Sequence, residues 1–198
     1  MSRNFVNISM RLTQFFAITE EDYGNLPERG YHLGAGVLIY CPDTGRALLQ
    51  KRGPRVEDPG QYDYFGGGVD DGENVLEGAI RELEEEGGIS AKESELYPLA
   101  VFGKDMSLKL GGYHIFLMLV DKEFEPALNY DADAHDEVAG AEWLGREDYE
   151  GSNIHKRVTT LMNNPGLEEA VQNAARTLQG VSQEDSGYQV QDGPTESY

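Results

Sequence analysis

The chain has little cysteine, few basic residues and no long apolar run. Cys41 is the single cysteine among 198 residues, which excludes an internal disulfide and suits a reducing compartment. No apolar run reaches the roughly 18–20 residues that a membrane-spanning helix needs. The first residues also lack the apolar core of a signal peptide. We therefore expect a cytoplasmic protein without a membrane segment.

Basic residues number 16 against 36 acidic ones, which gives a net charge of −20. This balance argues against a broad surface for nucleic acid or for anionic membranes, because both need a basic face. The same field repels a polyphosphate, so such a substrate would arrive with divalent cations or meet a local basic patch. Hydrophobic residues make up 39% of the chain, enough for one globular domain with a sizeable core.

A Gly-rich loop followed by an acidic helix, from Gly67 to Ile89, is the most informative stretch. Asn74 followed by Glu77 has the spacing of an N-terminal cap, and the Gly87–Gly88 pair ends the helix. Apolar residues at helical spacing predict a stripe that faces the core. This stripe consists of Leu76, Ala79, Ile80 and Leu83.

Three carboxylates, on Glu82, Glu85 and Glu86, fall on a second face of this helix. Like charges at these spacings destabilise a helix by roughly 0.2–0.5 kcal/mol per pair. A bound cation would remove that cost, and clustered carboxylate oxygens suit Mg²⁺ or Mn²⁺. The alternative is a solvated acidic face, which is what most charge runs are.

The spacing across the stretch favours the metal site. The pattern G-x5-E-x7-R-E-U-x-E-E-x-G-U, with U an aliphatic residue, is complete. Its fixed positions are Gly67, Glu73, Arg81, Glu82, Leu83, Glu85, Glu86, Gly88 and Ile89. This pattern is the Nudix box, so the chain resembles the Nudix hydrolase family. The resemblance implies an α/β fold, an α/β/α sandwich around a mixed β-sheet, with the box helix at its active edge.

The resemblance also implies a metal-dependent pyrophosphohydrolase that uses Mg²⁺ or Mn²⁺. Its substrate would be a nucleoside diphosphate linked to a further group, such as ADP-ribose, a dinucleotide, a nucleotide sugar or a (d)NTP. The implied metal ligands are Glu82, Glu85, Glu86 and a backbone carbonyl near Gly66. The implied catalytic residues, one of which accepts the proton of the attacking water, are Glu82, Glu85 and Glu137.

Other roles are assigned to residues around these acids. Arg81 is expected to orient the acids by ion pairing, with Glu77 as one partner, and Glu73 to support the junction of loop and helix. Three basic residues at the end of the preceding strand are candidates for contacts with substrate phosphates, although they also fit ordinary surface charges: Lys51, Arg52 and Arg55. Three aromatic residues fit either base stacking or core packing: Tyr62, Tyr64 and Phe65.

The rest of the chain supports one domain, with a core over residues 33–150. Strands are expected at residues 33–40, 46–52, 61–65, 96–102, 113–120 and 138–144, with 113–120 in the centre of the sheet. His114 is interpreted as a hydrogen-bonded sheet residue and Trp143 as a core residue. Residues 1–32 form an extension that packs on the core, 151–179 two helices of the same domain, and 180–198 a disordered acidic tail.

Two other functions stay open. One is a nucleotide-binding or sensing module without turnover, although such proteins usually lose acids of the box. The other is a prenyl-diphosphate isomerase, which needs a well-placed catalytic cysteine, and Cys41 is the only candidate. The expected partner is a small nucleotide, and homodimer formation is left open by the sequence.

Overall fold

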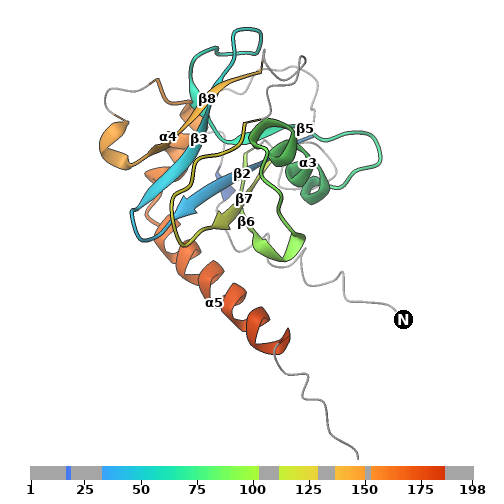
Figure 1. The fold of residues 1–198 in the computed structure, drawn as a ribbon, viewed down its shortest axis with the longest axis vertical. Helices are drawn as coiled ribbons and strands as arrows, with labels where there is room; N and C mark the ends of the chain where they lie inside the picture. Colours follow the sequence, from blue (N-terminus) through green and yellow to red (C-terminus); the bar gives the residue numbers. More distant parts are fainter. Residues whose placement is uncertain (1–16, 19–32, 103–111, 129–136, 150–152, 186–198) are drawn as a thin grey trace, which may run out of the picture.

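The computed structural model describes residues 17–18, 33–102, 112–128, 137–149 and 153–185. Its centre is an eight-stranded mixed sheet with helices on both faces (Figure 1). In the described part of the chain, no helix is long and apolar enough to span a membrane. The expected α/β sandwich is confirmed.

The sheet is ordered β1-β6-β7-β2-β3-β4, with β5 paired to β2 and β8 paired to β3. Strands β1 and β6 pair in parallel, as do β2 and β7, and the other pairs are antiparallel. The strands are β1 (Ala17–Ile18), β2 (Leu33–Cys41), β3 (Arg46–Arg52), β4 (Tyr62–Asp63), β5 (Phe65–Gly68), β6 (Leu96–Phe102), β7 (Gly112–Leu119) and β8 (Val138–Leu144). Strand β7 lies between β6 and β2, so the prediction that this most apolar strand is central is confirmed.

Alternation along the strands divides the core into two layers. On β2, Val37 and Ile39 face the layer under helix α3 (Val75–Gly87), whereas Leu38 faces the opposite layer. That opposite layer is covered by α4 (Lys156–Met162) and α5 (Leu167–Asp185). The one-turn 3₁₀ helices Glu93–Glu95 and Arg146–Asp148 precede β6 and follow β8. Figure 1 shows α3 on one side of the sheet and α4 with α5 on the other.

Three expectations about local structure need correction. The segment expected as one short strand at 61–65 forms two strands, and Gly66, Gly67 and Gly68 continue the second of them, paired to β2. Helix α5 ends at Asp185, so it continues past Gly180, where the tail was expected to begin. His114 is buried, but neither ring nitrogen has a hydrogen-bond partner among the described residues.

Close packing of β2, β5 and the ring of Tyr113 leaves no room for a Cβ atom at three glycines. A Cβ on Gly36 would lie 2.9 Å from Oη of Tyr113, and one on Gly34 would lie 2.5 Å from the same ring. Gly66 has a φ of +154°, and a Cβ there would lie 2.3 Å from the carbonyl oxygen of Ala35. Glycine is thus required where β2, β5 and Tyr113 meet.

Parts of the predicted domain organisation lie outside the described residues. Within the predicted extension, only Ala17–Ile18 is described, and it pairs with β6.

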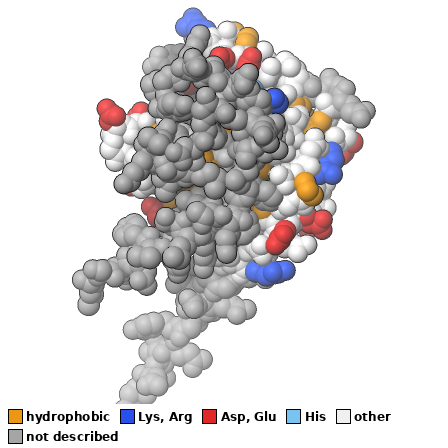
Figure 2. Space-filling model, turned by 180° about the vertical axis from the view of Figure 1, so that it is seen from behind, with side chains coloured by type: hydrophobic (Ala, Val, Ile, Leu, Met, Phe, Trp, Pro, Cys, Tyr) orange, Lys and Arg blue, Asp and Glu red, His pale blue; other side chains and the backbone are white. Residues whose placement is uncertain are grey.

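Trp143 packs against the layer under α3, and its indole N–H donates to the carbonyl oxygen of Phe124 at 2.7 Å. On the face seen in Figure 2, the described part carries basic, acidic and apolar side chains interspersed along its rim.

Candidate active site

Helix α3 is fixed at both ends by the residues that the sequence indicated. The side chain of Asn74 accepts hydrogen bonds from the backbone N–H groups of Leu76 and Glu77, and the carboxylate of Glu77 accepts one from the backbone of Asn74. At the other end, Gly88 adopts the left-handed conformation with φ 60°. These two caps fix the ends of the helix, and the packing of Ala79 and Leu83 in the core sets the direction in which its acids point.

The three acids of the helix differ in exposure. The side chain of Glu85 is 58% exposed and that of Glu82 is 13% exposed, whereas Glu86 is buried at 7%. The carboxylate of Glu82 lies against β5, where a Cβ on Gly67 would be 2.6 Å from Oε1 of Glu82. Glycine at this position therefore allows the backbone of β5 to approach the helix acid closely.

Glu86 is held inside the protein by two hydrogen bonds to one oxygen. The backbone N–H of Gly66 donates to its Oε2 at 2.7 Å, and the side-chain amide of Gln50 donates to the same atom at 2.8 Å. Burial raises the pKa of Glu86 to about 8, although both hydrogen bonds oppose this rise. A cation at this carboxylate would stabilise its charged form.

Glu137, from the segment just before β8, lies close enough to these acids to affect their ionisation. Burial raises the pKa of Glu82, and the charges of Glu85 and Glu137 add to the rise. The charges of Glu82 and Glu137 likewise raise the pKa of Glu86. The backbone carbonyl of Glu137 accepts a hydrogen bond from the N–H of Gly53 at 2.6 Å, which ties this segment to the end of β3.

Arg81 is the counter-ion within this cluster. Its guanidinium donates to Glu73 at 2.9 Å, to Glu82 at 3.0 Å, to Glu85 at 2.9 Å and to the carbonyl oxygen of Gly68 at 2.8 Å. The hydrogen bond from Arg81 lowers the pKa of Glu73, which also accepts from the backbone of Asp70. The expected pairing of Arg81 with Glu77 is wrong, because Glu77 caps the helix instead.

The acids are chemically suited to a hard divalent cation. They supply carboxylate oxygens, the ligands that Mg²⁺ and Mn²⁺ prefer, and their mutual repulsion would be relieved by a positive ion. Among the described residues, however, no three such side chains converge on one point. Arg81 bridges Glu82 and Glu85, and Glu86 points toward Gly66 and Gln50. The carboxylates are therefore of the right chemical type for a divalent cation, but Arg81 occupies Glu82 and Glu85 in this structure.

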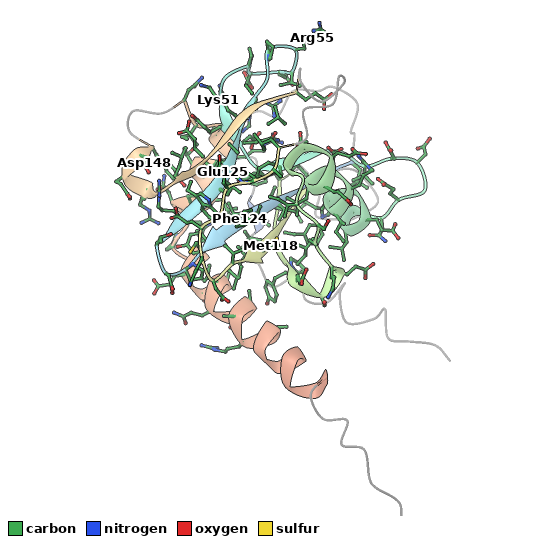
Figure 3. The ribbon with its side chains drawn as sticks, in the orientation of Figure 1. Lys51, Arg55, Met118, Phe124, Glu125 and Asp148 are labelled. Carbon is green, nitrogen blue, oxygen red and sulfur yellow. The ribbon has the colours of Figure 1, made fainter. Side chains whose placement is uncertain are left out.

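Two of the three basic residues proposed as phosphate contacts, Lys51 and Arg52, contact groups other than the acids of α3. Lys51 lies over the ring of Tyr62, with Nζ 5.7 Å from its centroid. Arg52 donates to the carbonyl oxygen of Glu57 and to Asp63. Figure 3 shows Arg55 at the tip of the loop after β3, where it extends away from the sheet. Their role in substrate binding stays a prediction.

Asp63 is the centre of a buried ionic cluster that sequence reasoning missed. It is 1% exposed and receives Arg52 from β3 at 3.2 Å and Arg157 from α4 at 2.6 Å. The guanidinium of Arg157 also stacks 4.2 Å over the ring of Tyr113. Burial lowers the pKa of His155, the cap of α4, which lies beside the same carboxylate. The cluster connects α4 to the sheet.

The aromatic residues before the box are structural where they are buried. Tyr64 and Phe65 are at most 1% exposed, which leaves them no surface for stacking on a base. Tyr62 is half-buried, and its hydroxyl donates to Glu142 at 2.7 Å. Gln50 was also missed, although one sequence signal exists, because an amide two positions after the inward-facing Leu48 needs a polar partner.

A pocket of about 500 Å³ opens beside β3 and β8. Phe124 and Trp143 form part of its wall, and Leu48, two residues before Gln50 on β3, lines it as well. Acidic side chains around it include Glu125, which is labelled with Phe124 in Figure 3. Because successive strand residues on one face are roughly 7 Å apart, the pocket neighbours the contact between Gln50 and Glu86.

Known structures share this fold. A crystal structure of the Deinococcus radiodurans protein DR0079 matches with a TM-score of 0.52 and 19% identity, covering 70% of this chain and 86% of that one. A NUDIX hydrolase from Nitrosomonas europaea matches with a TM-score of 0.51 and 19% identity, covering 75% of this chain and 76% of that one.

A further structural match is a bifunctional NMN adenylyltransferase/ADP ribose pyrophosphatase from Francisella tularensis, complexed with AMP and a manganese ion. Its TM-score is 0.54 at 17% identity, and the match covers 82% of this chain and 47% of that one. These identities establish similarity of fold.

In sequence, the chain is 24% identical over 133 residues to Nudix hydrolase 2 of Arabidopsis thaliana. The match covers 67% of this chain and spans 45% of the length of that relative. The family profile described as NUDIX domain matches residues 30–162. That range includes more than half of the chain and all of the box, and the chain therefore belongs to the Nudix family.

Proposed function

We propose that the protein is a metal-dependent hydrolase that cleaves the diphosphate linkage of a nucleoside diphosphate joined to a further group. The observation that carries this proposal is that acids from two distant segments lie close enough together to raise the pKa values of Glu82 and Glu86. Glu82, Glu85 and Glu86 come from α3, and Glu137 comes from the chain before β8. Hydrolysis at phosphorus needs clustered charge to bind cations and a base for water, and this cluster offers both.

Each acid receives a role from its surroundings. Glu86, fixed by Gly66 and Gln50, and Glu82, packed on Gly67, are the rigid ligands of the proposed site. Glu85 and Glu137 are exposed, and Glu85 could turn toward a ligand or a water molecule once its hydrogen bond with Arg81 is released. The proton of the attacking water goes to a carboxylate among Glu82, Glu85 and Glu137.

Bound Mg²⁺ or Mn²⁺ would neutralise the diphosphate and lower the pKa of a bound water. Arg81 pairs with Glu82 and Glu85, and a cation held by these two acids would displace its guanidinium, which Glu73 would retain nearby. A backbone carbonyl near Gly66 stays part of the proposed ligand set. In this structure, the N–H of Gly66 donates to Oε2 of Glu86.

The relatives support the proposed class of substrate. One structural neighbour is named an ADP ribose pyrophosphatase and was crystallised with AMP and manganese, and the Arabidopsis relative is named a Nudix hydrolase. We extend to this chain only the shared chemistry, a nucleotide diphosphate bound with a divalent cation. A small nucleotide as partner and a cytoplasmic location belong to the same proposal.

The geometry gives the isomerase alternative no support. Cys41 is buried at the end of β2, at the turn into β3. It lies five residues beyond Gly36, the partner of Gly66, which corresponds to roughly 16 Å along an extended strand. A thiol at that end of the strand is remote from the acids of α3.

Turnover by the purified protein tests the proposal. The protein is incubated with Mg²⁺ or Mn²⁺ and a panel of (d)NTPs, ADP-ribose, NADH, FAD, dinucleoside polyphosphates and nucleotide sugars, and the products are separated by chromatography. We expect a mononucleotide product that requires the cation. Glu85→Gln and Glu86→Gln should each reduce the rate by at least roughly 100-fold, the upper end for groups that only support metal ligands.

Glu84→Gln is the matched control. This acid is exposed on the same helix, one residue before Glu85, and removing its charge should leave the rate near that of the wild type. Absence of product with either metal across the panel would overturn the proposed hydrolase activity. Equal losses in all three variants would show that helix charge in general matters, and not the proposed ligands.

A further inference from the structure

Gln50 is a polar residue in the interior of the sheet. It lies on β3, with Asp63 of β4 on one side and Ala141 of β8 on the other, and is 2% exposed. Leu48, on the same face of the strand, packs in the apolar layer under α3. An amide in such a place is costly unless hydrogen bonds satisfy it.

The amide nitrogen of Gln50 makes two hydrogen bonds. It donates to the carbonyl oxygen of Tyr64 at 2.7 Å and to Oε2 of Glu86 at 2.8 Å. Both partners are acceptors, which fixes the orientation of the amide, because only its NH₂ group can serve them. The other amide atom, Oε1, is buried without a partner among the described residues. Apolar packing alone would not select such a group.

Gln50 shares its target with the backbone of β5. The N–H of Gly66 donates to the same Oε2 of Glu86 at 2.7 Å. Two donors, one from β3 and one from β5, therefore hold a single carboxylate oxygen between them. No hydrogen bond to the second oxygen, Oε1 of Glu86, is found within the described ranges.

We propose that Gln50 is a positioning residue for the cation site, which holds Oε2 of Glu86 and thereby presents Oε1 of Glu86 to a divalent cation. This inference rests on the proposed function, because it takes Glu86 as a ligand. Outer groups that orient metal ligands influence affinity strongly, since they set the direction of the ligand before the metal arrives. Gln50 itself touches neither cation nor substrate.

Manganese binding without substrate provides the test. Free Mn²⁺ is followed by electron paramagnetic resonance while the full-length protein is titrated. Gln50→Met keeps the length of the side chain and removes both N–H donors, so we expect the affinity for Mn²⁺ to fall about 10-fold. Gln50→Glu exchanges the N–H donor for an acceptor and should show at least the same loss of affinity for Mn²⁺. This variant replaces Gln50→Met in the test if Gln50→Met does not fold.

A double-mutant cycle separates positioning from general disruption. Glu86→Gln alone should weaken Mn²⁺ binding, and adding Gln50→Met to it should cause no further loss, because the ligand that Gln50 orients is then gone. Leu49→Val is the control, since it truncates a buried side chain of the opposite layer. It should lower the unfolding temperature and leave the affinity for Mn²⁺ unchanged.

The possible results distinguish a failure of the role of Gln50 from a failure of the proposed function. Unchanged Mn²⁺ affinity in Gln50→Met, with weakened binding in Glu86→Gln, overturns the role of Gln50 and leaves the proposed function intact. Equal losses from Gln50→Met in both backgrounds also overturn it. A wild type that binds Mn²⁺ through Glu86 and Gln50 but hydrolyses nothing refutes only the proposed activity. A wild type that binds no Mn²⁺ refutes both.

Discussion

Replacing His114 by leucine should remove a defined part of the acid sensitivity of the fold. His114 lies on β7, is 2% exposed and has no hydrogen-bond partner for its ring among the described residues. Desolvation by burial disfavours the charged imidazole and lowers its pKa to about 4, from an ordinary value of 6.5. The unfolded chain therefore takes up a proton at a pH where the folded protein does not.

The sign and size of the effect follow from these two pKa values. Well above pH 6.5 the ring is neutral in both states, so it makes no contribution to pH dependence there. As the pH falls toward 4, the free energy of unfolding decreases by up to about 1.4 kcal/mol per pH unit, and below that both states are protonated. Between about pH 7 and about pH 5 the loss sums to roughly 2 kcal/mol. The His114→Leu variant should not show this loss of stability.

Urea unfolding, followed by the fluorescence of the single tryptophan, Trp143, measures this difference. The stability of His114→Leu relative to the wild type should rise by about 2 kcal/mol over that pH interval. Acids with raised pKa values, Glu82 and Glu86, titrate in both proteins and cancel in the comparison. Phe116→Leu, on the same strand, should differ from the wild type by a constant amount. A constant difference for His114→Leu as well would refute the reasoning.

Three further substitutions and one control, Gly68→Ala, test the framework of the site by urea unfolding. Gly66→Ala should lower the free energy of unfolding by at least roughly 3 kcal/mol, because the new Cβ meets a backbone oxygen at 2.3 Å. Gly68→Ala should lower it by under about 1 kcal/mol, because the space around Gly68 is open. Asn74→Ala removes the cap of α3 and should cost about 1 kcal/mol, measurable also as lost helical circular dichroism. Asp63→Asn leaves Arg52 and Arg157 without their buried counter-ion and should cost about 3 kcal/mol; a loss below about 1 kcal/mol would contradict the ionic cluster.

The local features of the box could be predicted from the sequence because short-range rules determine them. The cap formed by Asn74 and Glu77 and the glycine end at Gly88 depend on residues within a few positions of one another, and both are confirmed. The order of helices and strands after the box follows from hydrophobic periodicity in the same way. Glu137 was expected only through the family resemblance, and its electrostatic effect on Glu82 and Glu86 supports that expectation.

The long-range contacts could not be read from the sequence in this way. Arg81 has Glu77 one helical turn away, yet its partners include Glu73, because the loop folds back along the helix. Gln50 meets Glu86 across 36 positions, and Arg157 meets Asp63 across 94, with no motif that links either pair. The sequence indicates candidate acids for the site, whereas the tertiary fold decides which neutral and basic groups contact them.

The ion pair between Asp63 and Arg157 has a consequence for synthesis on the ribosome. Asp63 lies in β4, which emerges early, and its buried carboxylate needs a guanidinium from α4, which is made about half a chain length later. Until α4 has left the exit tunnel, Arg52 is the only arginine of this cluster available to that carboxylate. The contact between β4 and α4 therefore forms only after nearly the whole domain has been translated. A chain that stops before α4 would remain a substrate for chaperones and proteases.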